Sequence, residues 1–346
     1  MIQQIRVKDL IEGEILAESI FDCKGKLILA KYTSINHYMI SILRHHGVQA
    51  IKVIQKEDKE QLGAYESFWI LKEDYKECIQ MLKDVLYGLI SGKSAGYKAL
   101  NPIVDILLQH MDETDGILKV LEEEKRYDEY TYTHSLNVAL YAMLIGKWLK
   151  LELVEIEELV IAGLLHDIGK TRVPLAILNK QGRLTEIEFK VMKGHPMDGY
   201  KILKRHDQFS NKIREAVLLH HERMDGSGYP FAHDEEQIPL FARIIAVADV
   251  YDAITTDRVY KARLTPFETF AILKTTELKN LDPAIVDVFI RCICVHYVGI
   301  EVLLNTGEVA EVVYVPPQCL TDPIIRIEDE YLDISRRRDK LIVEVV

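Results

Sequence analysis

Histidine and aspartate recur at regular distances through the middle of the sequence, and these residue types are the ones best suited to hold metal ions. The set comprises His134, His166, Asp167, His195, His220, His221 and Asp249. The steps 134 to 166, 167 to 195, 195 to 220 and 221 to 249 are 32, 28, 25 and 28 residues. Imidazole and carboxylate together suit iron, manganese, zinc or nickel better than calcium. The spacing therefore predicts one ligand group per helix of a bundle, converging in its interior.

The size of this set indicates two metal ions. Seven candidate ligands are too many for one tetrahedral structural zinc. They suit two octahedral ions that share a bridging carboxylate, the arrangement that hydrolases of phosphate esters use. Asp167 is predicted to be the bridge.

The ordinary alternative is that each histidine is a hydrogen-bonded core or surface residue. Local context argues against it for the set above. His166 and Asp167 close a very apolar segment, where two polar side chains need partners. His220 and His221 lie about 100° apart on a helix, so only one would normally reach a core. Asp249 lies inside an apolar run, where an unpaired carboxylate is costly. The ordinary interpretation is kept for His37, His45, His46, His110, His206, His233 and His296.

Basic side chains near these ligands are predicted to bind phosphate. Lys170 follows Asp167 by three residues, which places an ammonium group beside the predicted metals, where a phosphate oxygen would lie. Arg258 and Lys261 follow Asp249 by nine and twelve residues. On one helical face they could bind a second phosphate or a base edge.

Helical periodicity dominates the segments that must position these residues. Residues 125–298 are predicted to form an all-helical bundle, because several helices are apolar nearly all round. Residues 64–124 are predicted to be a helical connector that supports a homodimer. Residues 1–63 indicate a small mixed α/β domain, and residues 299–346 a β appendage. The expected fold is multi-domain and mainly α.

The N-terminal segment shows strand and turn signals. Residues 15–20 and 26–30 are strand-like runs on either side of the turn residues 22–25. A helix capped by Ser34 and ended by Gly47 should follow. The polar stretch 56–63 is predicted to be the domain boundary.

Composition excludes several functional classes. The chain has 346 residues, with 43 basic and 54 acidic side chains and a net charge of −11. Without a basic stripe it is a poor candidate for binding duplex nucleic acid. No apolar run approaches the ~18 residues that span a bilayer, so we expect no membrane segment and a cytoplasmic protein. The cysteines are odd in number and expected to be reduced.

Taken together, the motifs resemble the HD-GYP family, a branch of the HD metal-dependent phosphohydrolases. The resemblance covers about residues 120–300. It rests on YTHS at 132–135, HDIGK at 166–170, GH at 194–195, HHERMDGSGYP at 220–230 and ADVYDA at 248–253. It implies an all-helical domain that binds two, sometimes three, iron or manganese ions. The implied activity is hydrolysis of cyclic di-GMP to the linear dinucleotide pGpG and often on to GMP.

Residue by residue, the seven histidines and aspartates resemble the family's metal ligands. The residues that resemble its substrate-contacting positions are Lys170, Asp252, Arg258 and Lys261. We also expect the loop residues Gly226, Gly228 and Tyr229 to contact substrate, since glycines allow close approach of the backbone. Members with a third metal have a glutamate four residues before the first histidine. Here that position is Tyr130, which favours two metals.

The mechanism implied by this resemblance uses a hydroxide shared by the two metals, with Asp167 bridging them and Lys170 stabilising charge on the phosphoryl oxygens. One alternative is a catalytically silent receptor for cyclic di-GMP, or a module that binds a protein partner through the loop 226–230. Another is an HD phosphohydrolase that acts on a different nucleotide. The loop 226–230 argues against this second alternative, because generic HD hydrolases lack it.

Overall fold

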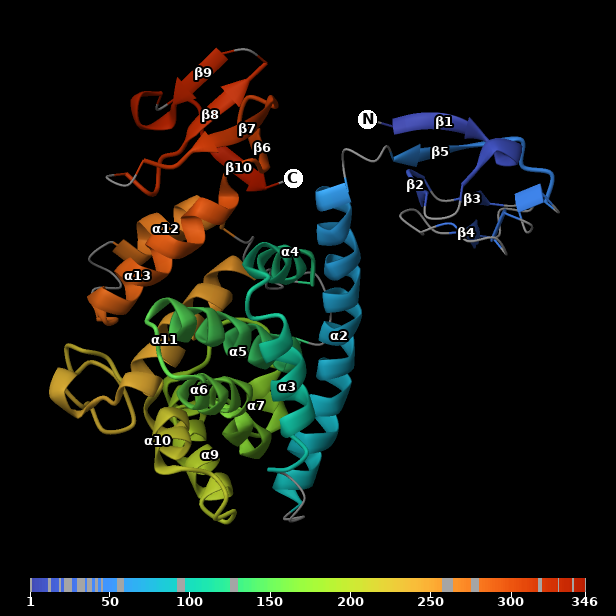
Figure 1. The fold of residues 1–346 in the computed structure, drawn as a ribbon. Coiled ribbons are helices and arrows are strands. Elements are labelled where there is room, and N and C mark those ends of the chain that lie inside the picture. The colour runs from blue at the N-terminus through green and yellow to red at the C-terminus, as the bar shows by residue number, and fades with distance from the viewer. Residues whose placement is uncertain are drawn as a thin grey trace. The chain divides into compact units, whose positions relative to one another are not determined.

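The structure of the chain is a computed structural model (Figure 1), and it divides into two compact units, Met1–Glu73 and Asp74–Val346. Each unit is described by itself. The residues that the structure describes are 2–11, 14–18, 20–21, 27–29, 35, 39–40, 43–44, 46–54, 59–91, 97–124, 130–256, 264–274, 280–316, 319–328, 330–337 and 339–345.

Short antiparallel strands form the first unit. One sheet has the order β1-β5-β2, with β1 at Ile2–Arg6, β5 at Ala50–Ile54 and β2 at Ile15–Leu16. A separate pair joins β3 (Ile20–Phe21) to β4 (Leu27–Leu29). In β5, Ile51 and Val53 are buried and Lys52 between them is exposed, the alternation expected of a half-buried strand. The predicted run 26–30 contains β4, whereas the predicted run 15–20 is divided between β2 and β3, which belong to different sheets. The turn at 22–25 and the cap Ser34 lie outside the described residues.

The helical connector differs from its predicted limits. Helix α2 runs from Lys59 to Ile90, so the polar stretch 56–63 is not a boundary loop throughout. Its lysine, glutamate and glutamine residues are good helix formers, which explains the early start. The rest of the predicted connector, up to residue 124, contains two further helices, α3 (Asn101–Gln109) and α4 (Thr114–Glu124). The dimer that this segment was expected to support stays a prediction.

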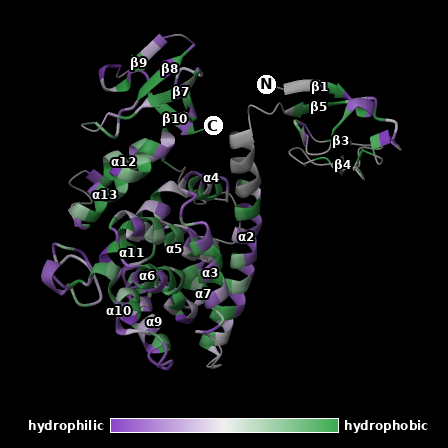
Figure 2. Cartoon of the chain, viewed as in Figure 1, coloured by the Kyte–Doolittle hydropathy of each residue, from purple (hydrophilic) through white to green (hydrophobic). Residues whose placement is uncertain are grey.

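A helical bundle forms the main body of the second unit. Its α-helices are α5 (Tyr130–Trp148), α6 (Leu153–Leu165), α7 (Leu175–Leu178), α8 (Glu186–Met192), α9 (His195–Leu203), α10 (Asn211–Leu219), α11 (Leu240–Thr255), α12 (Pro266–Lys274) and α13 (Pro283–Cys294). Helix α5 packs against both α6 and α11. Residues 133–146 of α5 are buried on every side, which confirms the prediction of a bundle core, and Figure 2 shows hydrophobic residues along α5 and α11. Within the described ranges, no helix is both long and apolar enough to cross a membrane.

Strands within residues 301–345 form an antiparallel sheet. Its order is β10-β6-β7-β8-β9, with β6 at Glu301–Leu304, β7 at Val309–Tyr314, β8 at Ile324–Ile327, β9 at Glu330–Asp333 and β10 at Ile342–Val345. Val302 and Leu304 of β6 are buried and alternate with more exposed residues. The predicted β appendage is therefore confirmed as a sheet with a core face of its own.

Candidate metal centre

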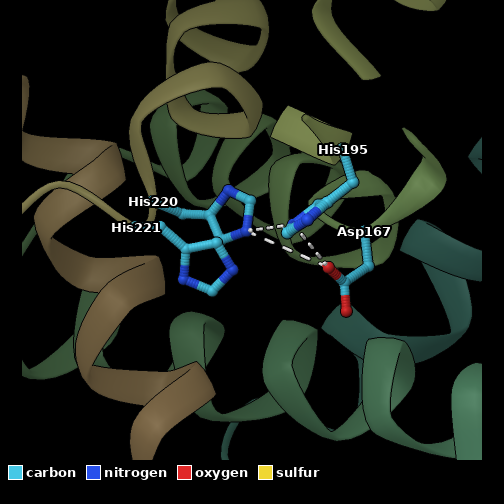
Figure 3. A group of neighbouring side chains, drawn as sticks. All are labelled: Asp167, His195, His220 and His221. Carbon is cyan, nitrogen blue, oxygen red and sulfur yellow. Dashed lines mark hydrogen bonds and ion pairs between the residues drawn. The ribbon is translucent and has the colours of Figure 1, made fainter. Parts of the chain in front are cut away.

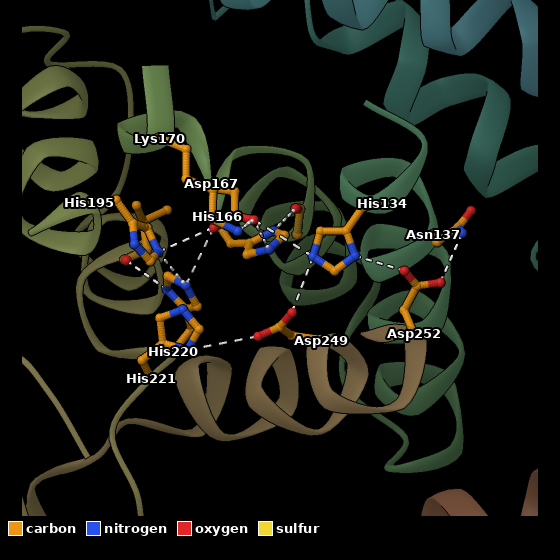
Figure 4. A network of polar contacts seen from close by, with 12 residues as sticks. His134, Asn137, His166, Asp167, Lys170, His195, His220, His221, Asp249 and Asp252 are labelled. Atoms are coloured by element: carbon orange, nitrogen blue, oxygen red, sulfur yellow. Dashed lines mark hydrogen bonds and ion pairs between the residues drawn. The ribbon is translucent and has the colours of Figure 1, made fainter. Parts of the chain in front are cut away.

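The structure brings all seven candidate ligands together in the interior of the bundle (Figure 4). They come from five helices or helix ends: His134 lies in α5, His166 and Asp167 follow α6, His195 begins α9, His220 and His221 follow α10, and Asp249 lies in α11. His221 and Asp249 are partly exposed, whereas the other five are buried. Convergence of one ligand group per helix was the prediction from the spacing.

Three of these histidines donate their Nδ1 proton to the helix turn that precedes them. In each case the acceptor is the carbonyl three residues earlier, a group that a helix end leaves without an intrahelical partner. The bonds run from His166 to Gly163 O (2.8 Å), from His195 to Met192 O (2.8 Å) and from His220 to Val217 O (2.9 Å). With Nδ1 protonated, the Nε2 of a neutral ring carries a free lone pair, the form that binds a metal ion.

Asp167 lies between two groups of these Nε2 atoms. Its Oδ1 is 3.2 Å from His195 Nε2 and 3.9 Å from His220 Nε2 (Figure 3). Its Oδ2 is 3.2 Å from His166 Nε2 and 3.7 Å from His134 Nε2. One carboxylate oxygen thus faces each group, the geometry expected of a bridging ligand.

Asp249 reaches the same two groups from α11. Its Oδ1 is 3.1 Å from His134 Nε2, and its Oδ2 is 3.8 Å from His221 Nδ1. Burial by itself would raise the pKa of the Asp249 carboxyl, but the surrounding histidine rings, His134 first, hold that pKa well below its usual value. Burial likewise opposes ionisation of Asp167, and nearby His166 and Lys170 outweigh it, so its pKa is also well below normal. Both carboxylates are therefore ionised at neutral pH.

These side chains fit a cation better than they fit one another. Among the described residues, His166 Nε2 and Asp167 Oδ1 are buried without a hydrogen-bond partner, which is costly for polar atoms. The Nε2 atoms of His195 and His220 face each other at 3.4 Å, although both rings already donate through Nδ1. Lone pairs that converge in this way on two carboxylates form a metal-binding donor set. The residues present thus fit metal ions of the kind predicted from the sequence.

Comparison with known families identifies the family of this helical region. Residues 100–285 match the family described as the HD domain. The chain belongs to the HD-domain family. The match includes α5 to α11 and therefore every candidate ligand.

Two relatives of known name are similar to this chain over different lengths. It is 36% identical over 250 residues to the cyclic di-GMP phosphodiesterase PA4108 of Pseudomonas aeruginosa, which covers 72% of this chain and 59% of that protein. It is 38% identical over 154 residues to the 3′3′-cGAMP-specific phosphodiesterase 3 of Vibrio cholerae, covering 44% of this chain and 33% of that protein. The chain thus spans less than two thirds of the length of either relative.

A solved structure confirms the fold. The HDG"Y"P protein Bd1817 of Bdellovibrio bacteriovorus matches with a TM-score of 0.52 at 14% identity, over 84% of this chain and 98% of that chain. With the relatives above, this confirms the resemblance to the HD-GYP branch that the motifs indicated.

Burial also determines the protonation of two histidines in the HD domain. Burial, assisted by neighbouring histidine rings, lowers the pKa of His220 well below its ordinary value. Burial likewise lowers the pKa of His221 to about 3, against the opposing charge of Asp249. Both rings are therefore neutral at neutral pH, as metal binding requires.

We expect the metal-free HD domain to lose stability as the pH falls below about 6.5. Unfolded histidine takes up a proton near this pH, whereas folded His220 and His221 resist protonation. The unfolded state then binds more protons, so two such groups lower the free energy of unfolding by up to about 2.7 kcal/mol per pH unit between about pH 5.5 and 4. Urea unfolding in the presence of a chelator measures this slope. The variant His221→Asn should reduce it by about 1.4 kcal/mol per pH unit, and an unchanged slope would contradict the assignment.

Lys170 lies beside the centre, as predicted. Its Nζ is 2.5 Å from Asp167 Oδ2, and its side chain is one-quarter exposed. Gly169 allows this segment to pack closely, because a Cβ there would come 1.9 Å from His195 O. The absence of a side chain at Gly169 thus sets the distance between the segment carrying Lys170 and the start of α9.

Asp252 is a buried link to His134 in this structure, and its predicted contact with substrate stays a prediction. Asp252 is fully buried, and both of its carboxylate oxygens accept hydrogen bonds from within the HD domain. His134 Nδ1 donates to Oδ2 at 2.7 Å and Asn137 Nδ2 donates to Oδ1 at 2.9 Å. Asp252 lies one helical turn after Asp249 on α11, and its hydrogen bond with Nδ1 orients the His134 ring.

Glu222 is a structural residue of the loop 220–230 that the sequence analysis missed. It is 2% exposed, and its two carboxylate oxygens accept hydrogen bonds from Phe231 N (2.7 Å) and His233 N (3.0 Å). It therefore ties the far end of the loop back to its beginning. A glutamate directly after two candidate ligands was the available signal, because a charged side chain so close to a buried centre needs partners.

Glycine is needed at the two loop positions 226 and 228 for different structural reasons. A Cβ at Gly228 would come 2.4 Å from both Arg223 N and Glu222 Cα, so the loop packs against its own start there. Gly226 has a φ of +73°, and the nearest atom to its Cβ position is Ala232 O at 3.6 Å. These packing and backbone reasons account for both glycines, and their contact with substrate stays a prediction.

Alanine substitutions should separate these two reasons. Gly228→Ala should lower the free energy of unfolding by about 2–3 kcal/mol, because the backbone must move to admit the methyl group. Gly226→Ala should cost only about 1 kcal/mol, the strain of a left-handed backbone without a clash. Urea unfolding of the metal-loaded proteins measures both. Equal losses for the two variants would show that the contact at Gly228 is not tight.

Other predicted residues lie beside the centre or beyond the described part of the chain. The Tyr229 ring lies 4.7 Å from the His221 ring and has Lys193 Nζ 5.2 Å from its centroid. Arg258 and Lys261 lie outside the described residues. Among the histidines interpreted as ordinary, His110 is buried and held by Asp74 and Glu113.

Proposed function

We propose that this chain is a metal-dependent phosphodiesterase that hydrolyses cyclic di-GMP to the linear dinucleotide pGpG, with two divalent cations, iron or manganese, as cofactors. The observation that carries the proposal is the position of Asp167, with one oxygen toward each of two histidine groups. The match to a named cyclic di-GMP phosphodiesterase supports the substrate.

In this proposal His134, His166, Asp167 and Asp249 would hold one cation, and Asp167, His195, His220 and His221 would hold the other. Bound cations supply Lewis acidity and lower the pKa of coordinated water. The HD domain supplies fixed ring tautomers and ionised carboxylates, which hold the donor atoms in place before substrate arrives. Burial of most of these groups strengthens every charge interaction within the centre.

Lys170 and Tyr229 are proposed to hold the substrate. The Lys170 ammonium lies against Asp167 and is the cation best placed to meet a charged phosphoryl oxygen. The Tyr229 ring, beside His221, offers an aromatic face for a nucleobase. Arg258 and Lys261 are proposed to contribute to substrate binding on the strength of the motif alone.

Metal content and product analysis test the proposed function together. Protein purified without oxygen should contain about two iron or manganese ions per chain. Incubated with cyclic di-GMP, it should yield pGpG by chromatography, and the same traces show whether GMP follows. A parallel incubation with 3′3′-cGAMP tests the choice of cyclic dinucleotide. Metal-loaded protein that binds cyclic di-GMP without cleaving it would overturn the proposal in favour of a receptor.

A further inference from the structure

A buried chain of hydrogen bonds leads from helix α2 to the metal centre. Tyr75 Oη donates to Asn137 Oδ1 at 2.6 Å, and Asn137 Nδ2 donates to Asp252 Oδ1 at 2.9 Å. Asp252 Oδ2 accepts from His134 Nδ1 at 2.7 Å. None of these four side chains is more than 4% exposed. The chain thus links three helices, α2, α5 and α11, within the second unit.

The direction of each bond follows from the chemistry of the groups. The amide nitrogen of Asn137 donates to the Asp252 carboxylate, so it is this nitrogen that faces Asp252. Its carbonyl oxygen then faces Tyr75, whose hydroxyl must donate. At the other end His134 donates through Nδ1, which leaves Nε2 as the atom that faces the metal centre. Asp252 therefore fixes the direction of the Asn137 amide, and the Tyr75 hydroxyl supplies the donor for the amide oxygen on its other side.

Loss of the Tyr75 hydroxyl would disturb this order. The buried Asn137 Oδ1 would lose its donor, which is unfavourable for a polar atom away from water. A rotated amide would place its oxygen against the Asp252 carboxylate, where two acceptors repel. Either change weakens the hold on Asp252 and, through it, on the ring of His134 (Figure 4).

Helix α2 is held firmly where Tyr75 enters the core. The preceding residue, Asp74, accepts a hydrogen bond from His110 Nε2 at 2.8 Å, and the Nδ1 of the same ring lies 3.2 Å from Glu113 Oε1. His110 is buried, so these contacts fix the position of the helix at this point. The earlier residues of α2, 59–73, belong to the first unit, so one helix runs from that unit to Tyr75.

We propose that Tyr75 is a positioning residue of the metal centre, through which helix α2 sets the orientation of His134 by way of Asn137 and Asp252. The inference rests on the metal centre of the proposed function but not on its substrate. In this proposal the position of α2 and metal binding beside His134 are coupled. A change in the position of α2 alters the metal affinity, and metal binding alters the equilibrium between positions of α2 by the same factor.

The test compares Tyr75→Phe with Tyr297→Phe in the full chain. Tyr297 is a matched control, because its buried hydroxyl bonds to Tyr251 at 3.3 Å and is not one of the links described above. Each protein is freed of metal with a chelator and titrated with Mn²⁺ alone by calorimetry. Tyr75→Phe should bind one Mn²⁺ about tenfold more weakly, the lower end of what an outer-shell partner contributes. Tyr297→Phe should bind as the wild type does.

A double-mutant cycle tests the route. If Tyr75 acts through Asn137, the Tyr75→Phe change should have no further effect on Mn²⁺ affinity in an Asn137→Ala background. Independent, additive losses would overturn the proposal. So would equal losses in Tyr75→Phe and Tyr297→Phe, which would indicate general loosening of the core.

Hydrogen exchange on the wild type gives a measurement that does not depend on any variant folding. Adding Mn²⁺ should slow amide exchange in α2 around Tyr75 as well as in α5, because the two ends are coupled. Unchanged exchange in α2 on metal binding would overturn the inference. Wild-type protein that binds no Mn²⁺ would instead refute the metal centre, and failure to cleave cyclic di-GMP would leave the Mn²⁺ results untouched.

Discussion

Asp167→Ala should remove both the metal ions and the hydrolytic activity. Asp167 is buried and its two oxygens face different histidine groups, so its loss deprives both cation sites of an anionic ligand. We expect the metal content to fall from about two ions per chain to less than one, and kcat/KM for cyclic di-GMP to fall about 10⁴-fold. Metal analysis and product chromatography on the same preparation measure the two effects.

A matched variant separates this effect from damage to the fold. Asp198 also pairs with a lysine three residues later, Lys201, but at the surface. Asp198→Ala should therefore keep the metals and the activity. Asp167→Asn retains the size of the side chain and serves if the alanine variant unfolds. Full activity in a metal-depleted, folded Asp167 variant would show that Asp167 does not bridge the metals.

The positions of the ligands could be predicted because each depends on local sequence. Apolar periodicity defines the helices, and His166, Asp167, His195 and His220 follow or begin such helices. The last carbonyl groups of a helix have no intrahelical hydrogen-bond donor. The histidines that follow these helices supply one through Nδ1. Convergence of the set followed from having one ligand group per helix in a bundle whose centre is apolar.

The buried hydrogen bonds of Asp252 could not be predicted from local sequence pattern. Asp249 and Asp252 lie three residues apart on one face of α11, and the sequence gives no measure of how deeply each is buried. The burial of Asp252 depends on packing against α5. Asn137 and His134 of that helix lie more than 100 residues away from Asp252 along the chain and form hydrogen bonds with it. Tyr75 lies 62 residues from Asn137 on a helix outside the family motifs. Such long-range pairs come from packing, which periodicity does not encode.

Lys170→Ala should lower the rate of catalysis without weakening metal binding. An ammonium group beside Asp167 competes electrostatically with a cation for that carboxylate, so its removal should leave metal affinity unchanged or tighter. The variant also lacks the positive charge that stabilises the negative charge developing on the phosphoryl oxygens. Its kcat should therefore fall about 10²- to 10³-fold. Mn²⁺ titration and steady-state kinetics with cyclic di-GMP measure the two quantities separately.

The alternative for Lys170 is that it only positions Asp167, and the two readouts distinguish the cases. If Lys170 served to hold Asp167 in place, Lys170→Ala would weaken Mn²⁺ binding and lower activity together. Lys201→Ala removes the surface lysine at the same spacing from an aspartate and should alter neither quantity. Loss of activity with retained metal in Lys170→Ala, but not in Lys201→Ala, would place the ammonium group at the substrate. The centre would then keep its metals and Asp167, and would lack only the charge that meets the phosphoryl group.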